Sequence, residues 1–373
     1  MEVELSWLCS VVQRHCPVFF LHPADRYLPC SAEFFLQHSE LRVAAPGGGH
    51  AVLLPRESVA GPLLADAQRQ HPGRRLWLEL DPAARTGEPL ERLDEVPVYA
   101  HPRHVISASG EVEAIEIVYI TIYAYNGAYK VGGLPWLQTG AHDGDIEHLT
   151  VRVHPTSGAL QGVWYNAHRS RDGCWVAAPQ VPRCATTGRI AAYVALHGHG
   201  TYPAVGRVFR HFFCGNDLCS DAGPAWRPRR TVLLPPVHGP GKPPLGGGGA
   251  SQRRLMQVPS RGSLLPPVAD GSPEGGAGCS SGTNSGGSGE NGSIPNGGSA
   301  RHGSIVSGGG SGGSDGLPEV LADECCAWLE FRGQWGTTDA PAVQAWFSNA
   351  EPPVSRSALQ RLFLHPWPEP KSV

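Results

Sequence analysis

The sequence lacks a hydrophobic run long enough to cross a membrane as a helix. Its longest apolar runs, Cys16–Leu21 and Ile115–Tyr125, fall short of the roughly 20 residues that such a helix needs. The N-terminal apolar stretch is short and is followed by Arg14 and His15, where a secretory signal would have small residues. We therefore expect a soluble, cytoplasmic protein without a transmembrane segment.

The sequence also lacks an excess of charge of either sign, with 30 basic and 33 acidic residues. Its basic pairs, Arg229–Arg230 and Arg253–Arg254, are isolated and have no aromatic residues interleaved with them. A surface that binds single-stranded nucleic acid combines both kinds of residue. We expect no nucleic-acid partner. The composition does not indicate an oligomeric state.

No Cys-x-x-Cys motif is present, although the chain has ten cysteines. The only close pairs are Cys214 with Cys219 and the adjacent Cys325 and Cys326. This spacing does not fit a zinc knuckle or a redox site, and an intracellular chain keeps thiols reduced. We interpret the cysteines as buried or inert thiols.

A change in composition divides the chain into three parts. Residues 238–316 are rich in Gly and Ser and poor in large apolar residues, so they cannot bury enough surface to offset the entropy of ordering. We predict a disordered insert there. Residues 16–237 then form the main part of one domain, and residues 317–373 complete it, with a strand expected over Cys326–Trp335 because the residues alternate in character.

The main part is predicted to be mainly β, an antiparallel β-sandwich with a few short helices. Short runs of β-branched and aromatic residues recur between turn residues, which is typical of sandwiches. Ser31 is expected to cap a helix ending at Gln37, and a second helix is expected at Gly61–Gln70. The expected strands are Val18–Leu21, Val96–Val105, Ala114–Tyr125, Asp145–Val153, Leu160–Asn166 and Ile190–Leu196.

One segment combines two carboxylates and an imidazole. Asp145 and Glu147 have the same parity on a predicted strand and should share a face, and His142 lies just before them. This set would suit Mg²⁺, Ca²⁺ or Mn²⁺ and could also admit Zn²⁺. The alternative is a solvated strand face that carries a few charges.

Further histidines follow the ends of two other predicted strands. His168 closes the strand Leu160–Asn166, and His197 and His199 follow Ile190–Leu196 next to glycines that permit close approach of a ligand. A lone histidine is more often a satisfied core or surface residue. Several of them beside a carboxylate pair indicate a shared cavity.

The chain resembles the vacuolar protein sorting-associated protein 62 family in several segments that follow the family's order. The resemblance includes an N-terminal signature and a C-terminal segment, so the Gly/Ser-rich tract is an insertion within the domain. Asn126 lies in one matched segment, and we group it with the cavity-lining residues His168, His197 and His199. The matching segments are Phe20–Phe34, Tyr123–Gly127, Gly144–Arg152, Tyr165–His168, Tyr193–Pro203, Asn216–Cys219 and Trp328–Gly336.

A more distant resemblance involves the order of His142, Asp145 and Glu147. It is similar to the Gly-His-Arg-His-Asp-Trp-Glu motif of the necrosis- and ethylene-inducing peptide-like toxins, which are β-sandwich proteins that bind a divalent ion and a sphingolipid headgroup sugar. A downstream histidine pair lines the cavity of those toxins, at separations similar to those of His168 and His199. The resemblance implies a shared site in this chain.

Three hypotheses follow for the function. The first is a non-catalytic module that binds a glycan or lipid headgroup at a metal-centred cavity, acting peripherally at endomembranes as the family name implies. The second is a metal-dependent hydrolase with Glu147 or His168 as base. The third is a scaffold with an idle site, whose serine-rich insert is the interaction segment. The absence of a Gly-x-Ser-x-Gly motif from the folded part favours binding over catalysis.

Overall fold

Strand β7 (Val112–Asn126) is buried on both of its faces along most of its length. Its apolar odd-numbered side chains from Ile115 to Tyr123 join one hydrophobic core, and its even-numbered side chains from Val118 to Ala124 join a second. Successive residues of a strand point to opposite faces, so a nearly continuous apolar run fits a strand that is covered on both sides. The sheet that contains β7 is therefore a central layer between two cores.

The computed structural model describes residues 5–107, 109–130, 138–167, 169–209, 216–234, 317–321 and 326–337. The central sheet has the strand order β12, β11, β10, β7, β6, β18 and β19, with the short β2 also pairing with β7. Its first five strands pair antiparallel, while β18 and β19 are added in parallel. The bounds are β2 Pro29–Cys30, β6 Val98–Ile106, β10 His142–Val153, β11 Leu160–Ala167, β12 Arg169–Ala177, β18 Arg230–Leu233 and β19 Glu319–Leu321.

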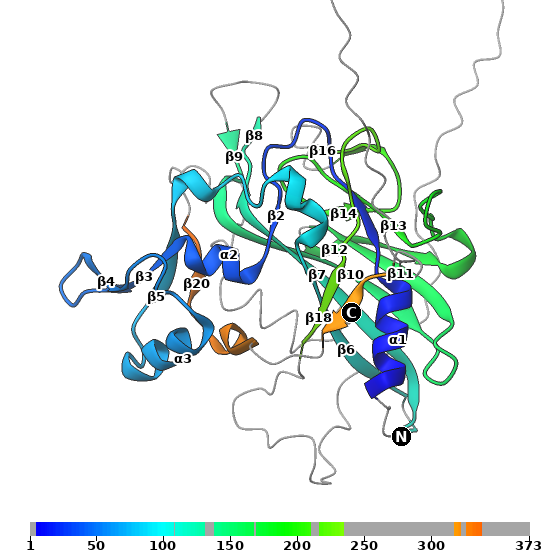
Figure 1. The fold of residues 1–373 in the computed structure, drawn as a ribbon, viewed down its shortest axis with the longest axis horizontal. Coiled ribbons are helices and arrows are strands. Elements are labelled where there is room, and N and C mark those ends of the chain that lie inside the picture. The colour runs from blue at the N-terminus through cyan, green and yellow to red at the C-terminus, as the bar shows by residue number, and fades with distance from the viewer. Residues whose placement is uncertain are drawn as a thin grey trace, which may run out of the picture. The chain divides into compact units, whose positions relative to one another are not determined.

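Two smaller sheets accompany the central one (Figure 1). One contributes to the core with Tyr119 and Trp226, and its order is β14 (Thr201–Tyr202), β13 (Ala191–Val194), β1 (Val18–Phe20) and β17 (Ala225–Trp226). The other contributes to the core with Ile120 and Trp335, and its order is β20 (Gln334–Trp335), β5 (Leu76–Leu80), β3 (Ser39–Ala44) and β4 (His50–Leu54). Two hairpins, β8–β9 (Tyr129–Lys130, Gln138–Thr139) and β15–β16 (Gly206–Phe209, Asn216–Cys219), complete the strands. The prediction of a mainly β, antiparallel-rich fold is confirmed.

The helices are short. Helix α1 (Leu5–His15) was not predicted, and it buries Val11 and Val12 in the core. Helix α2 (Ala32–Gln37) begins after Ser31, whose Oγ accepts a hydrogen bond of 2.9 Å from the Phe34 backbone N–H, as predicted. Helix α3 (Gly61–Gln70) has the predicted bounds, and 3₁₀ turns occur at Pro82–Ala84, Leu90–Glu95, Ala178–Gln180 and Cys326–Glu330. No helix of the described residues is long and apolar enough to cross a membrane.

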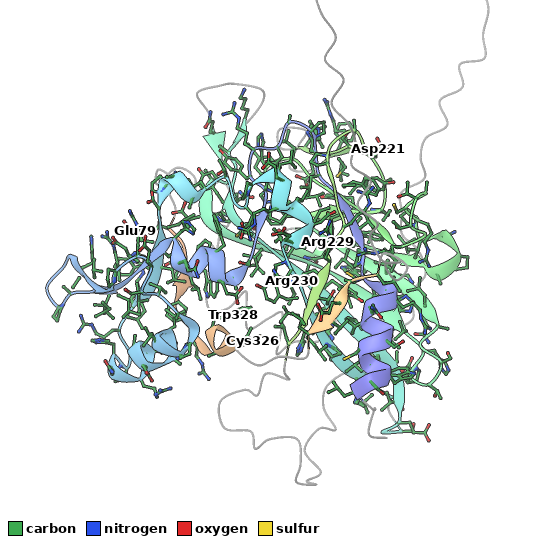
Figure 2. The ribbon with its side chains drawn as sticks, viewed as in Figure 1. Glu79, Asp221, Arg229, Arg230, Cys326 and Trp328 are labelled. Atoms are coloured by element: carbon green, nitrogen blue, oxygen red, sulfur yellow. The ribbon has the colours of Figure 1, made fainter. Side chains whose placement is uncertain are left out.

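The strand predicted over Cys326–Trp335 is wrong for most of its length. Residues Cys326–Glu330 form a 3₁₀ turn, and only Gln334–Trp335 form a strand. Trp328, Phe331 and Trp335 are all buried, at spacings of three and four that fit a helical turn better than alternation. Trp328, which is labelled in Figure 2, is one of these buried residues. Its ring packs edge-on against Tyr99 and Trp335, with ring centroids 5.5 Å apart in both pairs.

The predicted insert, residues 238–316, lies outside the described residues, but the strands before and after it are neighbours. β18 and β19 pair in parallel, with Arg230 opposite Glu319 and Val232 opposite Leu321. The chain therefore leaves and re-enters the same sheet on adjacent strands.

Replacement of residues 240–315 by a flexible linker of about ten residues is expected to leave a folded domain, because the two flanking strands remain paired. The replacement halves the length of the connection about three times. It should therefore raise the free energy of unfolding by up to about 2 kcal/mol, which urea denaturation would measure. Truncation before Asp323 removes the buried Trp328 and Trp335 and should cause aggregation instead. Equal destabilisation by both changes would contradict a passive insert.

Candidate functional site

Two parallel strands bring distant segments of the chain together at one end of a sheet. β1 and β13 pair with Phe20 opposite Tyr193, so the residues that follow each strand leave the sheet at the same end. The segment after β1 carries Asp25, and the segment after β13 carries His197 and His199. This topology explains why residues more than 170 positions apart meet, since Asp25 Oδ2 accepts a hydrogen bond of 2.9 Å from the His197 backbone N–H.

His199 lies between two aspartates and is only 1% exposed to solvent. Its Nδ1 is 2.8 Å from Asp145 Oδ2, and its Nε2 is 3.5 Å from Asp25 Oδ2. The first distance is that of a charge-assisted hydrogen bond, whereas the second is too long for one. Nε2 accordingly has no hydrogen-bond partner in the part of the chain that the structure describes. A neutral ring that donates Nδ1–H to Asp145 keeps its lone pair on Nε2.

Tyr123 supports the other side of the imidazole. It lies opposite Asp145 on β7, and its ring stacks on His199 with centroids 3.8 Å apart and an interplanar angle of 2°. Burial raises the pKa of Tyr123 well above its ordinary value, and the negative charges of Asp145, Asp25 and Glu147 raise it further. Three carboxylates thus surround a phenol that stays neutral. We call Asp25, Tyr123, Asp145 and His199 the His199 cluster.

The turn after β13 fixes the direction of His199. His197 and His199 both have left-handed backbone conformations, with φ of 73° and 51°, which non-glycine residues rarely adopt. Hydrogen bonds hold this turn: His199 N–H donates to the Ala195 carbonyl at 3.1 Å, and Gly127 N–H donates to the His197 carbonyl at 2.9 Å. Two such conformations in three residues cost of order 1–3 kcal/mol each, so the surrounding contacts must determine them.

The structure places the predicted metal residues at the start of β10. Asp145 belongs to the His199 cluster, and Glu147 is buried, on the same parity and close enough to raise the pKa of Tyr123. His142 is half-buried, and its Nδ1 lies 3.2 Å from the Gly144 carbonyl oxygen rather than on a carboxylate. Burial lowers the pKa of His142, against the opposing charge of Asp145. The three residues predicted as one ligand set are therefore neighbours in sequence, but His142 directs its Nδ1 to the backbone carbonyls of Asp143 and Gly144.

The predicted cavity-lining residues have different outcomes. His199 joins Asp145, and half-buried His197 lies beside Asp25, with its pKa lowered by burial and by the proximity of His199. Asn126 is buried and donates through Nδ2 to the Gly127 and Gly140 carbonyls, so it holds backbone together. His168 lies outside the described residues.

Sequence reasoning missed Asp25, Tyr123 and Asp217 as members of this region. Asp217 is fully buried on β16 and accepts hydrogen bonds from the hydroxyls of Tyr129, at 3.1 Å, and Tyr202. Tyr129 in turn meets His197 edge-on, with centroids 6.1 Å apart. Asp25 and Tyr123 lay within segments already matched to a family, but no local pattern indicated their contact with His199.

The described residues contain no group of three or more His, Cys, Asp or Glu side chains arranged as metal ligands. Among these residues, the unpartnered Nε2 of His199 and the carboxylate of Asp25 form one pair of groups that can bind a cation together. Two ligands bound to one ion at about 2.1 Å each, at a tetrahedral angle, lie about 3.4 Å apart. The separation of 3.5 Å fits such a pair, and Asp145 occupies the usual place of the carboxylate that orients a ligating histidine.

Comparison with known proteins gives few relatives. No match is found among curated proteins. A solved structure, Necrosis and Ethylene inducing Protein 2 from the causal agent of cocoa's Witches Broom disease, is similar over 57% of this chain and 68% of its own, with 11% sequence identity and a TM-score of 0.28.

The family model of vacuolar protein sorting-associated protein 62 matches residues 4–216. The matched range contains α1, strand β1 with the segment after it that carries Asp25, and strands β7 and β10, which carry Tyr123 and Asp145. It also contains the turn of His199. The chain belongs to the vacuolar protein sorting-associated protein 62 family.

Proposed function

We propose that this family member is a binding module that holds a divalent cation at the His199 cluster and uses it to recognise a polar ligand, a glycan or a lipid headgroup. The observation that carries the proposal is the buried, unpartnered Nε2 of His199 facing the Asp25 carboxylate. A buried ring nitrogen without a partner costs free energy, and an ion in contact with it would remove that cost.

The negative charges of the His199 cluster favour the binding of a cation. Asp25 and Asp145 are both nearly excluded from solvent, and His199 is the only described basic side chain that bridges them. Buried carboxylates need a partner of opposite charge, and one imidazolium cannot neutralise two. Asp25 and His199 would hold the ion, Asp145 would orient His199, and the ion would supply open positions for ligand oxygens.

The position of the cluster supports ligand access. His142 and His197 lie close enough to Asp145 and Asp25 for these carboxylates to raise their pKa, and both histidines are half-buried, so partly exposed residues border the cluster. The family name supports a role in vacuolar trafficking, and we place the protein in the cytoplasm, peripherally at endomembranes.

Asp25→Asn and Asp145→Asn are each expected to weaken divalent-cation binding at least about tenfold, since each removes a charge from the cluster. Ca²⁺, Mg²⁺, Mn²⁺ and Zn²⁺ would be titrated calorimetrically into chelator-stripped protein. At a hundredfold excess over Kd, the favoured ion should add about 2.7 kcal/mol to the wild-type free energy of unfolding.

Asp221→Asn is the matched control, because this exposed carboxylate lies outside the cluster (Figure 2). It should bind the ion like the wild type, and circular dichroism should show that all three variants fold. Equal affinity in Asp25→Asn and wild type, or no melting shift with any ion, would contradict the proposal. Screening of glycans and headgroups with and without chelator then tests whether the ligand needs the ion.

A further inference from the structure

A basic pocket of about 430 Å³ lies where helix α3 ends and strand β5 begins. It shares no residue with the His199 cluster. Three arginines and one histidine line it, and none of its lining residues is acidic. The lining residues are Gln68, His71, Pro72, Gly73, Arg74, Arg75, Leu76, Arg332, Gly333 and Gln334.

The pocket arginines are oriented by neutral groups. Arg74 Nε donates to the Ala44 carbonyl at 3.1 Å, and Arg75 Nη2 donates to Gln334 Oε1 at 3.0 Å. The guanidinium of Arg75 also lies over the Trp77 ring, 5.3 Å from its centroid. These contacts fix the direction of the guanidinium groups and leave their positive charges uncompensated.

Other arginines of the same part of the chain are paired with carboxylates. Arg42 contacts the carboxylate of Glu79 at 3.0 Å, Arg56 contacts Asp81 at 2.9 Å, and Arg69 pairs with Asp66. Within the described ranges, no carboxylate lies within 4.0 Å of Arg74, Arg75 or Arg332. The unpaired cations are therefore concentrated where the surface is concave.

Exposed arginines after a helix often do no more than complement the partial negative charge of its C-terminus. That charge is only about half an elementary charge and fades within one turn. Three guanidinium groups exceed it several-fold, and Arg332 comes from a segment more than 250 residues away in the sequence. The excess of positive charge thus has no carboxylate in direct contact within the described structure.

We propose that this pocket binds a small anion that carries more than one phosphate group. Guanidinium groups present paired N–H donors that match phosphate oxygens, and a concave site strengthens the attraction by focusing the field. The volume is within the range of small-molecule sites. The same phosphate chemistry could reach the pocket as a free solute or as the headgroup of a phosphoinositide.

Calorimetric titration of the full-length protein with pyrophosphate and with inositol hexakisphosphate tests the free solute. Co-sedimentation with phosphatidylcholine vesicles, with and without phosphatidylinositol bisphosphate, tests the headgroup. At least one probe is expected to bind, with an affinity that falls as salt rises from 50 to 300 mM. Binding in solution alone assigns a free solute, and binding in both assays assigns the lipid-borne group.

The double variant Arg75→Gln/Arg332→Gln is expected to lose at least about tenfold in affinity, because each glutamine removes a charge and its paired donors. Arg69→Gln is the matched control: it removes the same charge from α3 itself, where Asp66 already compensates it. The control should stay within about twofold of wild type. Absence of binding with every probe, or equal affinity in the double variant and wild type, would overturn the proposal. Neither result bears on the His199 cluster, whose residues are unchanged.

Discussion

Glu116→Gln is expected to lower the free energy of unfolding by about 3 kcal/mol. Glu116 is 1% exposed and lies between two arginines from the strands on either side of β7. Arg103 Nη2 is 2.7 Å from its Oε2, and Arg152 Nη2 is 2.6 Å from its Oε1. Removing the one carboxylate leaves two largely buried cations facing each other, and breaking such a pair costs more than the pair contributes.

Urea denaturation at neutral pH measures this effect. Glu113→Gln is the matched control, because Glu113 is exposed on the same strand and its loss should change stability by less than about 0.5 kcal/mol. Replacing Arg103, Glu116 and Arg152 together by apolar residues of similar volume should recover most of the loss. A triple variant as unstable as Glu116→Gln would show that the cost does not arise from uncompensated charge.

Local patterns predicted the elements whose stability is local. The cap of α2 was predictable because Ser31 and the backbone N–H that it accepts from are three residues apart. β7 was predictable because it is a run of β-branched and aromatic residues, and β10 because its burial alternates over part of its length. The sheet of β3, β4 and β5 was missed although β5 alternates strictly, because its leucines also favour helices and its partners are set by tertiary pairing.

The candidate site, too, was predictable only where it depends on residues close together in the sequence. Strand parity predicted that Asp145 and Glu147 share a side of their strand, and the negative charges of both raise the pKa of Tyr123. The contact of Asp25 with His199 required knowledge that β1 and β13 are parallel neighbours, which no local pattern encodes. Asp25 reaches His199 only through that pairing, so the ligand pair of the proposed ion differs from the set expected from His142, Asp145 and Glu147 alone.

Lowering the pH from 7 to 5 is expected to destabilise the protein by about 4 kcal/mol through two histidines. Burial, together with the smaller effect of the positive charge of Arg103, lowers the pKa of His101 to about 4 and that of His148 to about 3. In the unfolded chain both rings have their ordinary pKa of about 6.5 and take up protons below it. The folded state does not, so stability is complete above pH 6.5 and is lost as the pH falls toward 4.

Each histidine should contribute about 2 kcal/mol of this loss, at about 1.4 kcal/mol per pH unit below 6.5. His148→Gln should therefore reduce the difference between urea-derived stabilities at pH 7 and pH 5 by about 2 kcal/mol, in a range in which most carboxylates remain ionised. His154→Gln is the control, because this ring is exposed in a turn and its loss should leave the pH dependence unchanged. The sign is diagnostic: a protein that gains stability on acidification, or a His148→Gln variant with the full wild-type dependence, would show that the buried imidazole takes up its proton in the folded state.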